Sequence, residues 1–397
     1  MKKSVHDVVF VDGVRTPFGK ANGVYDETRA DDLVIRCIRT LLKRNPNLPP
    51  ERIDEVALAA TTQTGDQGLT IGRTASILAG LPRSVPGFAI DRMCAGAMTA
   101  VTSVGASIGV GAYDLAIAGG VESMTNHPMG EGADPNPRFV AENLVDPDAL
   151  NMGNTAESLH DKFPGITKER ADSYSAQTQA RYAKHVDVLS RDMTTVSARS
   201  TDEGWTLVSE DEPPRPGTTA EGLAGLRTPF RPHGRVTAGN AAPLTDGATA
   251  CLLASSETAA ELDLPVAMRM VGYAYAGVDP ELMGEGPIPS TEKALAKAGL
   301  TIDDIGLFEI NEAFAVQVLA FLDHFGIDQE DERVNPMGGA IAMGHPLASS
   351  GVRLMTQLSR SFEKNPQVKY GITTMCVGMG MGGTIIWENP AYNGEGA

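Results

Sequence analysis

The sequence is short of several features that would mark particular classes of protein. It has four cysteines in 397 residues and no CxxC pair, which suits neither a disulfide framework nor a zinc site. No window approaches the roughly 18 consecutive apolar residues of a membrane span. Lys and Arg number 33 against 50 Asp and Glu, and a net charge of -17 has the wrong sign for neutralising nucleic-acid phosphates. We therefore expect a cytoplasmic protein with no membrane span and no nucleic-acid partner.

Short apolar runs alternate with longer stretches of helical period, a pattern typical of a largely parallel α/β sheet covered on both faces. A first series has expected strands at 7–11, 55–60, 87–90 and 113–118 and expected helices at 31–42, 73–80 and 95–109. A second series has expected strands at 268–273, 305–310 and 371–377 and expected helices at 290–298 and 350–362. Because the two series have a similar order, the pattern predicts an internal duplication.

The region between the two series, from about Glu122 to Asp246, has a different composition. Pro, Gly and Asp cluster at 130–137 and 211–217, one helical stretch covers 168–185, and strands are hard to find. A long excursion of this kind usually carries binding function or contacts between subunits. We interpret it as an inserted region, not a linker.

Cys94 follows an expected buried strand and opens a helix of small residues. At such a junction a thiol faces unpaired backbone N–H groups and the positive end of the helix dipole, which should lower its pKa and make it a nucleophile. The alternative is a small apolar core residue, the usual place of a free cysteine.

Cys376 closes an expected strand and begins the glycine-rich stretch 376–383. A dinucleotide fingerprint is excluded because residues 384–387 continue as a strand and not as a helix. Two interpretations stay open. The glycines let the backbone approach a ligand with a free N–H, or they form a bulge or tight turn.

Two further polar residues lie where expected strands and helices meet. His345 lies in the glycine-rich loop 335–347 before an expected helix and is a candidate proton carrier, although a lone histidine is more often a satisfied polar group. Asn311 follows the strand 305–310, at the end where open parallel sheets bind ligands. Its alternative is an ordinary helix N-cap. Together with the two thiols these residues could form an acyl-transfer site.

Eight segments, taken in order, resemble the thiolase family over essentially the whole chain. These segments are 14–19, Cys94 with its small-residue helix, 119–124, 152–157, 236–240, 311–314, 338–346 and 376–378. The resemblance implies an α/β fold of two duplicated βαβαβαββ halves in a five-layer αβαβα arrangement with an inserted loop domain. It assigns 1–121 with 246–268 to the N-terminal half, 122–245 to the inserted loop and CoA-binding domain, and 269–397 to the C-terminal half.

The resemblance also implies a reaction. Thiolases join or split carbon chains on coenzyme A through an acyl-cysteine. By carry-over, Cys94 is the nucleophile, His345 activates it, and Cys376 is the general acid and base. Asn311 would hold a water that forms one oxyanion hole with His345, and the N–H groups of Cys94 and Gly378 would form the other.

Binding residues carry over in the same way. The positions matching CoA or substrate contacts are Arg215, Met152, Phe230, Ala238, Ala313, Met283 and Phe314. The expected partners are acyl-CoA and CoA as substrates, and no metal or other cofactor is implied. Ala242 stands where many members have Ser, which removes one expected hydrogen bond to CoA. Asp91 and Ala348 also depart from the family pattern.

Asn151 before Met152 resembles degradative bacterial 3-ketoacyl-CoA thiolases, which favours fatty-acid β-oxidation. We expect a homodimer or tetramer, which could belong to a multienzyme complex with a hydratase/dehydrogenase subunit. The alternatives are a short-chain acetoacetyl-CoA thiolase (acetyl-CoA C-acetyltransferase) and a noncatalytic CoA- or lipid-binding relative. A ketoacyl synthase would lack a second cysteine, so Cys376 opposes it.

Overall fold

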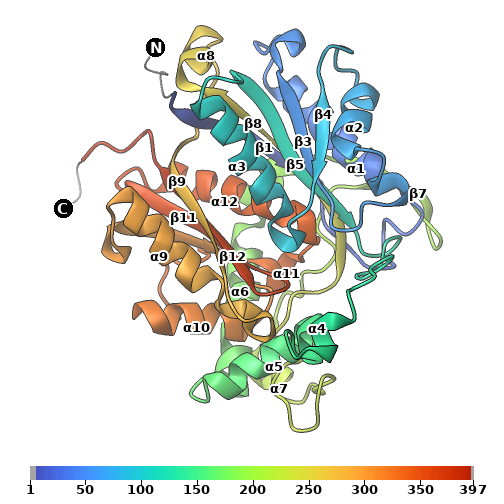
Figure 1. Cartoon of the computed structure of the whole chain (residues 1–397), viewed down its shortest axis with the longest axis vertical. Coiled ribbons are helices and arrows are strands. Elements are labelled where there is room, and N and C mark those ends of the chain that lie inside the picture. Colours follow the sequence, from blue (N-terminus) through green and yellow to red (C-terminus); the bar gives the residue numbers. More distant parts are fainter. Residues whose placement is uncertain (1–5, 395–397) are drawn as a thin grey trace.

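A computed structural model describes residues 6–394, which form two α/β halves and an inserted region (Figure 1). The N-terminal half has the elements β1 (Val8–Arg15), β2 (Gly19–Lys20), α1 (Ala30–Arg44), β3 (Glu55–Ala59), α2 (Ile71–Ala79), β4 (Gly87–Ile90), α3 (Gly96–Gly109), β5 (Leu115–Ser123), β8 (Thr245–Ser255) and α8 (Ser256–Glu261). Its sheet has the order β1-β8-β5-β3-β4. β5, β3 and β4 run parallel, whereas β8 is antiparallel to both of its neighbours. Every residue of β3, β5 and β8 is buried, which explains why their sequences do not alternate between polar and apolar residues.

The C-terminal half repeats this topology with one strand fewer. Its elements are β9 (Met268–Gly277), α9 (Pro287–Ala298), β10 (Ile305–Ile310), α10 (Ala315–Phe325), α11 (Ala340–Met343), α12 (Ser350–Lys364), β11 (Tyr370–Val377) and β12 (Met381–Glu388). The order is β9-β12-β11-β10, with β12 antiparallel to its neighbours and β11 parallel to β10. Beyond β10, in the place that β4 takes in the first half, Val334 makes a single parallel bridge to Phe308.

Strand pairing joins the two halves, and two helices lie between them. β1 pairs with β9 at Phe10 and Met268, which makes one ten-stranded sheet. α1 and α2 cover the outer face of the first half, α9 covers the outer face of the second, and α3 and α12 pack against each other between the halves. A Cβ on Gly351 of α12 would lie 2.5 Å from the backbone N of Met98, so this crossing requires a glycine. The resulting order of layers is αβαβα.

The inserted region contains more regular structure than its sequence indicated. It comprises α4 (Arg138–Ala141), α5 (Met152–Lys162), α6 (Lys168–Leu189), β6 (Val196–Ser200), β7 (Gly204–Val208) and α7 (Ala220–Ala224). α4, α5 and α7 lie together at one end of the molecule (Figure 1). The expectation of almost no strands was wrong, because β6 and β7 form a separate two-stranded ribbon. Within residues 6–394 no helix combines the length and apolar character that crossing a membrane would need.

Candidate active site

Cys94 lies in a strained junction between β4 and α3. The carboxylate of Asp91 accepts a hydrogen bond from the backbone N–H of Met93 at 2.6 Å, and Met93 has a positive φ of 44°. A non-glycine residue rarely adopts this conformation, and such strain is often found at functional sites. A 3-10 turn over Met93–Ala95 then leads into α3. The junction fixes the Cys94 side chain at the amino end of the helix, as the sequence predicted.

The expected low pKa of Cys94 was wrong. Burial raises the pKa of this thiol to about 11, although the N–H of Gly378 and its own N–H act in the opposite direction. The carboxylates of Glu122 and Asp91 raise it further. The positive end of the helix dipole does not lower the pKa enough to offset the rise that burial of the sulfur causes. The resting thiol therefore keeps its proton, and its activation requires a base.

Cys376 is the second-last residue of β11, the strand that contacts the turn Met93–Ala95 with Cys94. Burial raises its pKa well above the ordinary value, and the charge of a Cys94 thiolate would raise it further, so the two sulfurs share one environment. Gly378 directs its N–H at the Cys94 sulfur. A Cβ on Gly378 would lie 2.6 Å from the Met93 Sδ atom, which explains the glycine by close approach. The second interpretation of these glycines, a tight turn, holds as well, because Gly380 has a positive φ of 74°.

The histidine ring is held in one tautomer. His345 Nδ1 lies 2.6 Å from Ser350 Oγ, and that hydroxyl donates its hydrogen to the carbonyl of Pro346 at 3.2 Å. Ser350 must then accept the Nδ1–H, which leaves Nε2 with a free lone pair. Nε2 accepts a hydrogen bond of 3.3 Å from the Asn311 amide. Burial lowers the pKa of His345 to about 3, helped by the positive charge of Arg353, so the ring is a neutral base.

Backbone packing brings the His345 loop to Cys94. The turn Leu347–Ser349 contacts the turn Met93–Ala95, and a Cβ on Gly96 would lie 3.2 Å from the Cβ of Ala348. Buried Glu122 fixes this arrangement, because its carboxylate accepts from the backbone N–H of Ala348 at 3.1 Å and from Gln67 at 3.0 Å. This role of Glu122 was not predicted from the sequence, although its position at the end of a buried strand was a usable signal.

Asn311 is not a helix cap, so that alternative was wrong. Helix α10 begins at Ala315 and Phe314 precedes it. The next residue, Glu312, is fully buried and its carboxylate accepts from Tyr174 at 2.8 Å and from the N–H of Ile341 at 3.1 Å. A Cβ on Gly339 would overlap this carboxylate. Glu312 therefore fixes the glycine-rich loop that leads to His345, another role that the sequence analysis missed.

The residues expected to bind CoA fall into two groups. Met283, Ala313 and Phe314 are buried in the same hydrophobic cluster as Cys376, with partly buried Met152 packed against it. Arg215, Phe230 and Ala238 are exposed on the inserted region. The ring of Phe230 occupies the space where a Cβ of Gly153 would stand, so it lies on the amino end of α5, next to Met152.

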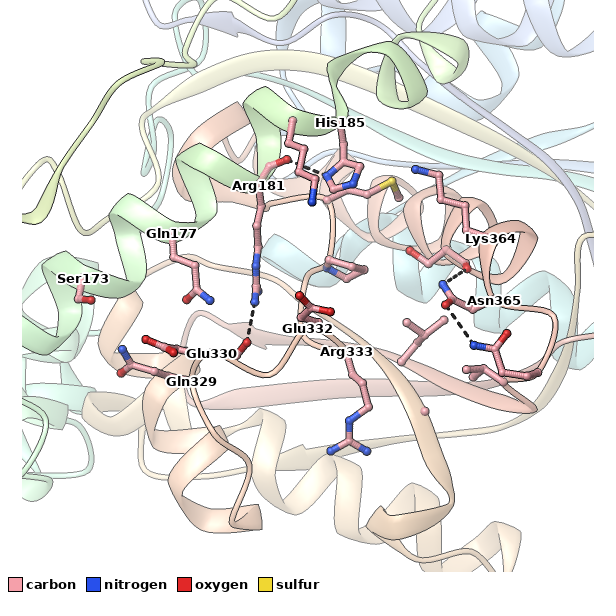
Figure 2. Close-up of a pocket in the computed structure, with 18 residues that line it drawn as sticks. Ser173, Gln177, Arg181, His185, Gln329, Glu330, Glu332, Arg333, Lys364 and Asn365 are labelled. Carbon is pink, nitrogen blue, oxygen red and sulfur yellow. Dashed lines mark hydrogen bonds between the residues drawn. The ribbon is translucent and has the colours of Figure 1, made fainter. Parts of the chain in front are cut away.

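A cavity of about 830 Å³ lies away from these groups, between α6, the segment 329–337 and the end of α12 (Figure 2). Arg181 lines this cavity and donates hydrogen bonds to the backbone carbonyls of Glu330 and Asp331 at 3.3 and 3.1 Å. Neither thiol lines it. In the described part of the chain no group of three or more His, Cys, Asp or Glu side chains is arranged to hold a metal ion.

Two family models together cover almost the whole chain. The thiolase N-terminal domain matches residues 8–257 and the thiolase C-terminal domain matches residues 264–389. The chain belongs to the thiolase family. This confirms the family expected from the eight sequence segments.

Individual relatives and solved structures agree with this assignment. A 3-ketoacyl-CoA thiolase from Aliivibrio fischeri is 41% identical over 389 residues, covering 97% of this chain and 100% of the relative. The structure of human mitochondrial 3-ketoacyl-CoA thiolase has a TM-score of 0.87 and 32% identity, covering 97% of this chain and 100% of that one. The acetyl-CoA acetyltransferase of Bacillus anthracis also has a TM-score of 0.87, with 34% identity, and covers 98% of this chain and 100% of its own. The expected fold class is confirmed.

Proposed function

We propose that this family member is a 3-ketoacyl-CoA thiolase, an acyltransferase that cleaves 3-ketoacyl-CoA with CoA to acetyl-CoA and a shortened acyl-CoA. The observation that carries the proposal is the meeting of two buried thiols: β11, which holds Cys376, contacts the turn Met93–Ala95, which holds Cys94, and the Gly378 N–H is directed at the Cys94 sulfur. The names of relatives covering the full chain support the same substrate class.

The first half-reaction forms the acyl-enzyme. His345 Nε2 takes the proton of the Cys94 thiol as the sulfur attacks the 3-keto carbon. The carbonyl oxygen gains negative charge, which N–H donors stabilise, each donor contributing roughly 3 kcal/mol by analogy with hydrolases. The C2–C3 bond then breaks and its electrons leave as the acetyl-CoA enolate. Cys376 gives its proton to C2, a role that suits a thiol with a raised pKa.

The second half-reaction restores both thiols. The Cys376 thiolate takes the proton of incoming CoA, whose sulfur attacks the acyl-Cys94 thioester. Cys94 leaves as a thiolate and recovers its proton from His345. The proton count closes within these three residues, and the reaction draws on no oxidant or reductant.

The test is a profile of turnover against acyl chain length. We expect thiolysis of C10 to C16 3-ketoacyl-CoA substrates to be faster than thiolysis of the C4 substrate, as fatty-acid β-oxidation requires. A strong preference for C4 would favour the alternative acetoacetyl-CoA thiolase, for which the similarity to the Bacillus anthracis acetyl-CoA acetyltransferase speaks. Absence of turnover at every length would favour the noncatalytic alternative.

Assembly and location belong to the same proposal. The protein acts in the cytoplasm as a homodimer or tetramer, within reach of a hydratase/dehydrogenase subunit. Among the described strands, β4 lies at the edge of the large sheet. The neighbouring helix α2 exposes Ile77 and Leu78. An unpaired strand edge beside exposed apolar side chains supports pairing of two copies of the chain along β4 and α2. Sedimentation at micromolar concentration tests this, with a monomer as the contrary result. Purification under mild conditions without any larger partner would count against the complex.

A further inference from the structure

A buried arginine stands directly behind the catalytic amide. Arg353 lies on the first turns of α12 and is 1% exposed. Its guanidinium donates 2.7 Å hydrogen bonds to Asn311 Oδ1 and to Gln357 Oε1. The opposite end of the same amide, Asn311 Nδ2, donates to His345 Nε2 at 3.3 Å. Arginine, asparagine and histidine thus form a single chain of contacts that ends at the reacting groups.

The hydrogen bonds along these three side chains can run in only one direction. An arginine side chain carries donors and no acceptor, so it can bond only to the oxygen end of an amide. With Oδ1 held by Arg353, the NH₂ group of Asn311 must face His345 and the substrate side. If the amide turned around, an oxygen would face the developing oxyanion and repel it. The arginine therefore decides which end of Asn311 the reaction meets.

A buried carboxyl group on the neighbouring strand lies close enough to Arg353 to feel its charge. Glu309 lies two residues before Asn311 on β10, on the same side of the strand, and is fully buried. Neither of its carboxylate oxygens has a hydrogen-bond partner within the described residues. Burial raises the pKa of Glu309 to about 8, and the positive charge of Arg353 opposes this rise. Burial lowers the pKa of Arg353 to about 10, which the Glu309 charge opposes in turn.

We propose that Arg353 is a positioning residue for the thiolase reaction: it fixes the Asn311 amide with Nδ2 toward His345 and the substrate oxygen. The role rests on the proposed function, because it acts on the oxyanion which that function requires. It differs from a purely structural role, which would affect folding but not the rate in the folded enzyme.

The test replaces Arg353 in the full chain. We expect Arg353→Gln to lower kcat for thiolysis about 100-fold with little change in KM, as expected for one misdirected oxyanion donor. Arg353→Lys keeps a donor for Oδ1 but loses the bond to Gln357, and should lose only about tenfold. Arg360→Gln on the same helix, which removes an ion pair with Asp192, is the matched control and should keep its kcat.

A double-mutant cycle separates positioning from stability. If Arg353 acts through Asn311, adding Arg353→Gln to Asn311→Ala should cost little further rate, whereas independent effects would multiply. If the Gln variant fails to fold, the Lys variant decides. A wild-type enzyme that turns over, with Arg353 variants equally fast, overturns the positioning role alone. A wild-type protein that forms no acyl-enzyme overturns the proposed function, and this role with it.

Discussion

The two halves of the molecule have the same strand topology but use equivalent junctions differently. In the N-terminal half, β4 leads through Cys94 into α3. In the C-terminal half the Val334 bridge takes the place of β4, and the loop that follows carries His345 to the start of α12. The proposed nucleophile and the proposed base thus stand at corresponding ends of two helices that pack on each other. A duplicated fold supplies two copies of one junction, and in the proposed mechanism each copy has a different chemical role.

The second pair of equivalent junctions differs in length. β5 ends at Ser123 and its antiparallel neighbour β8 begins only at Thr245, with the whole inserted region between them. β11 and β12 are joined by three residues, beginning with Gly378. The tight hairpin can hold a backbone N–H within reach of a sulfur, whereas the long excursion has room to bind a large cofactor-like substrate. The four predictions below test this division of roles.

The largest effect should come from Cys94, the residue that the N-terminal junction supplies. We expect Cys94→Ala to abolish acyl-enzyme formation and to lower turnover by roughly 10⁴-fold or more, because no other group in the junction can accept the acyl chain. The intact mass of the protein after addition of substrate measures this directly. An acyl mass increase that persists in the variant would refute the assignment.

Replacing Cys376, the thiol next to the β11–β12 hairpin, should slow both directions of the reaction. We expect Cys376→Ala to reduce thiolysis and condensation by about 10²- to 10⁴-fold, because protonation of carbon loses its donor. Cys94 should still be alkylated by iodoacetamide once the pH is raised toward its pKa of about 11, which shows that this sulfur remains accessible. Full activity in this variant would end the role of Cys376 in proton transfer.

His345, the proposed base at the C-terminal junction, should make the free energy of unfolding depend on pH. His345 has its pKa lowered from 6.5 to about 3 in the folded protein. Between these values the unfolded chain binds a proton that the folded chain does not, so stability falls as the pH is lowered below 6.5. The slope is about 1.4 kcal/mol per pH unit for this group.

Urea unfolding at pH 7, 6 and 5 measures this slope. The variant His345→Gln should show a slope shallower by about 1.4 kcal/mol per unit than the wild type. Replacing the exposed His324 in the same way provides the control. Parallel stability curves for wild type and His345→Gln would contradict the prediction.

The smallest effects should come from the two cysteines outside the junctions. Cys37 lies within α1 and Cys251 within β8, both fully buried. We expect Ala at either position to leave kcat unchanged and to lower the free energy of unfolding by about 1–2 kcal/mol through lost packing. Turnover and thermal unfolding of each variant check this. A loss of turnover in a variant that remains folded would break the distinction between the two pairs of thiols.

The sequence predicted those parts of the molecule that follow from local pattern. β4 and β10 have the predicted bounds, because short continuous apolar runs between turn signals mark strands. The expectation that the strand before Cys94 is buried was wrong, since every residue of β4 is half-buried. The β6–β7 ribbon was not predicted, because its strands are short and their exposed positions carry both polar and apolar residues. The location of Cys94 at a strand-to-helix junction was predicted, but not the direction of its pKa shift, which depends on burial by distant segments.

The supporting residues of the site could not be assigned from sequence for a related reason. Glu122, Glu312 and Arg353 are charged residues that the fold buries almost completely. In the sequence Glu312 and Arg353 resemble ordinary surface charges, because the partners that compensate them come from other segments. Glu122 ends a buried strand, which is a signal, but its contact with Ala348 could not be predicted. Only tertiary structure brings such partners together.

The raised pKa of Cys94 also affects how the protein withstands oxidants between turnovers. Peroxide reacts with thiolate, and the first product, a sulfenic acid, would disable the site. A sulfur with a pKa of about 11 offers almost no anion at neutral pH. In the proposed mechanism the thiolate arises when His345 takes the proton as the sulfur attacks the substrate. We therefore expect peroxide to oxidise Cys94 only slowly in the empty site, because the burial that raises its pKa also keeps the sulfur protonated.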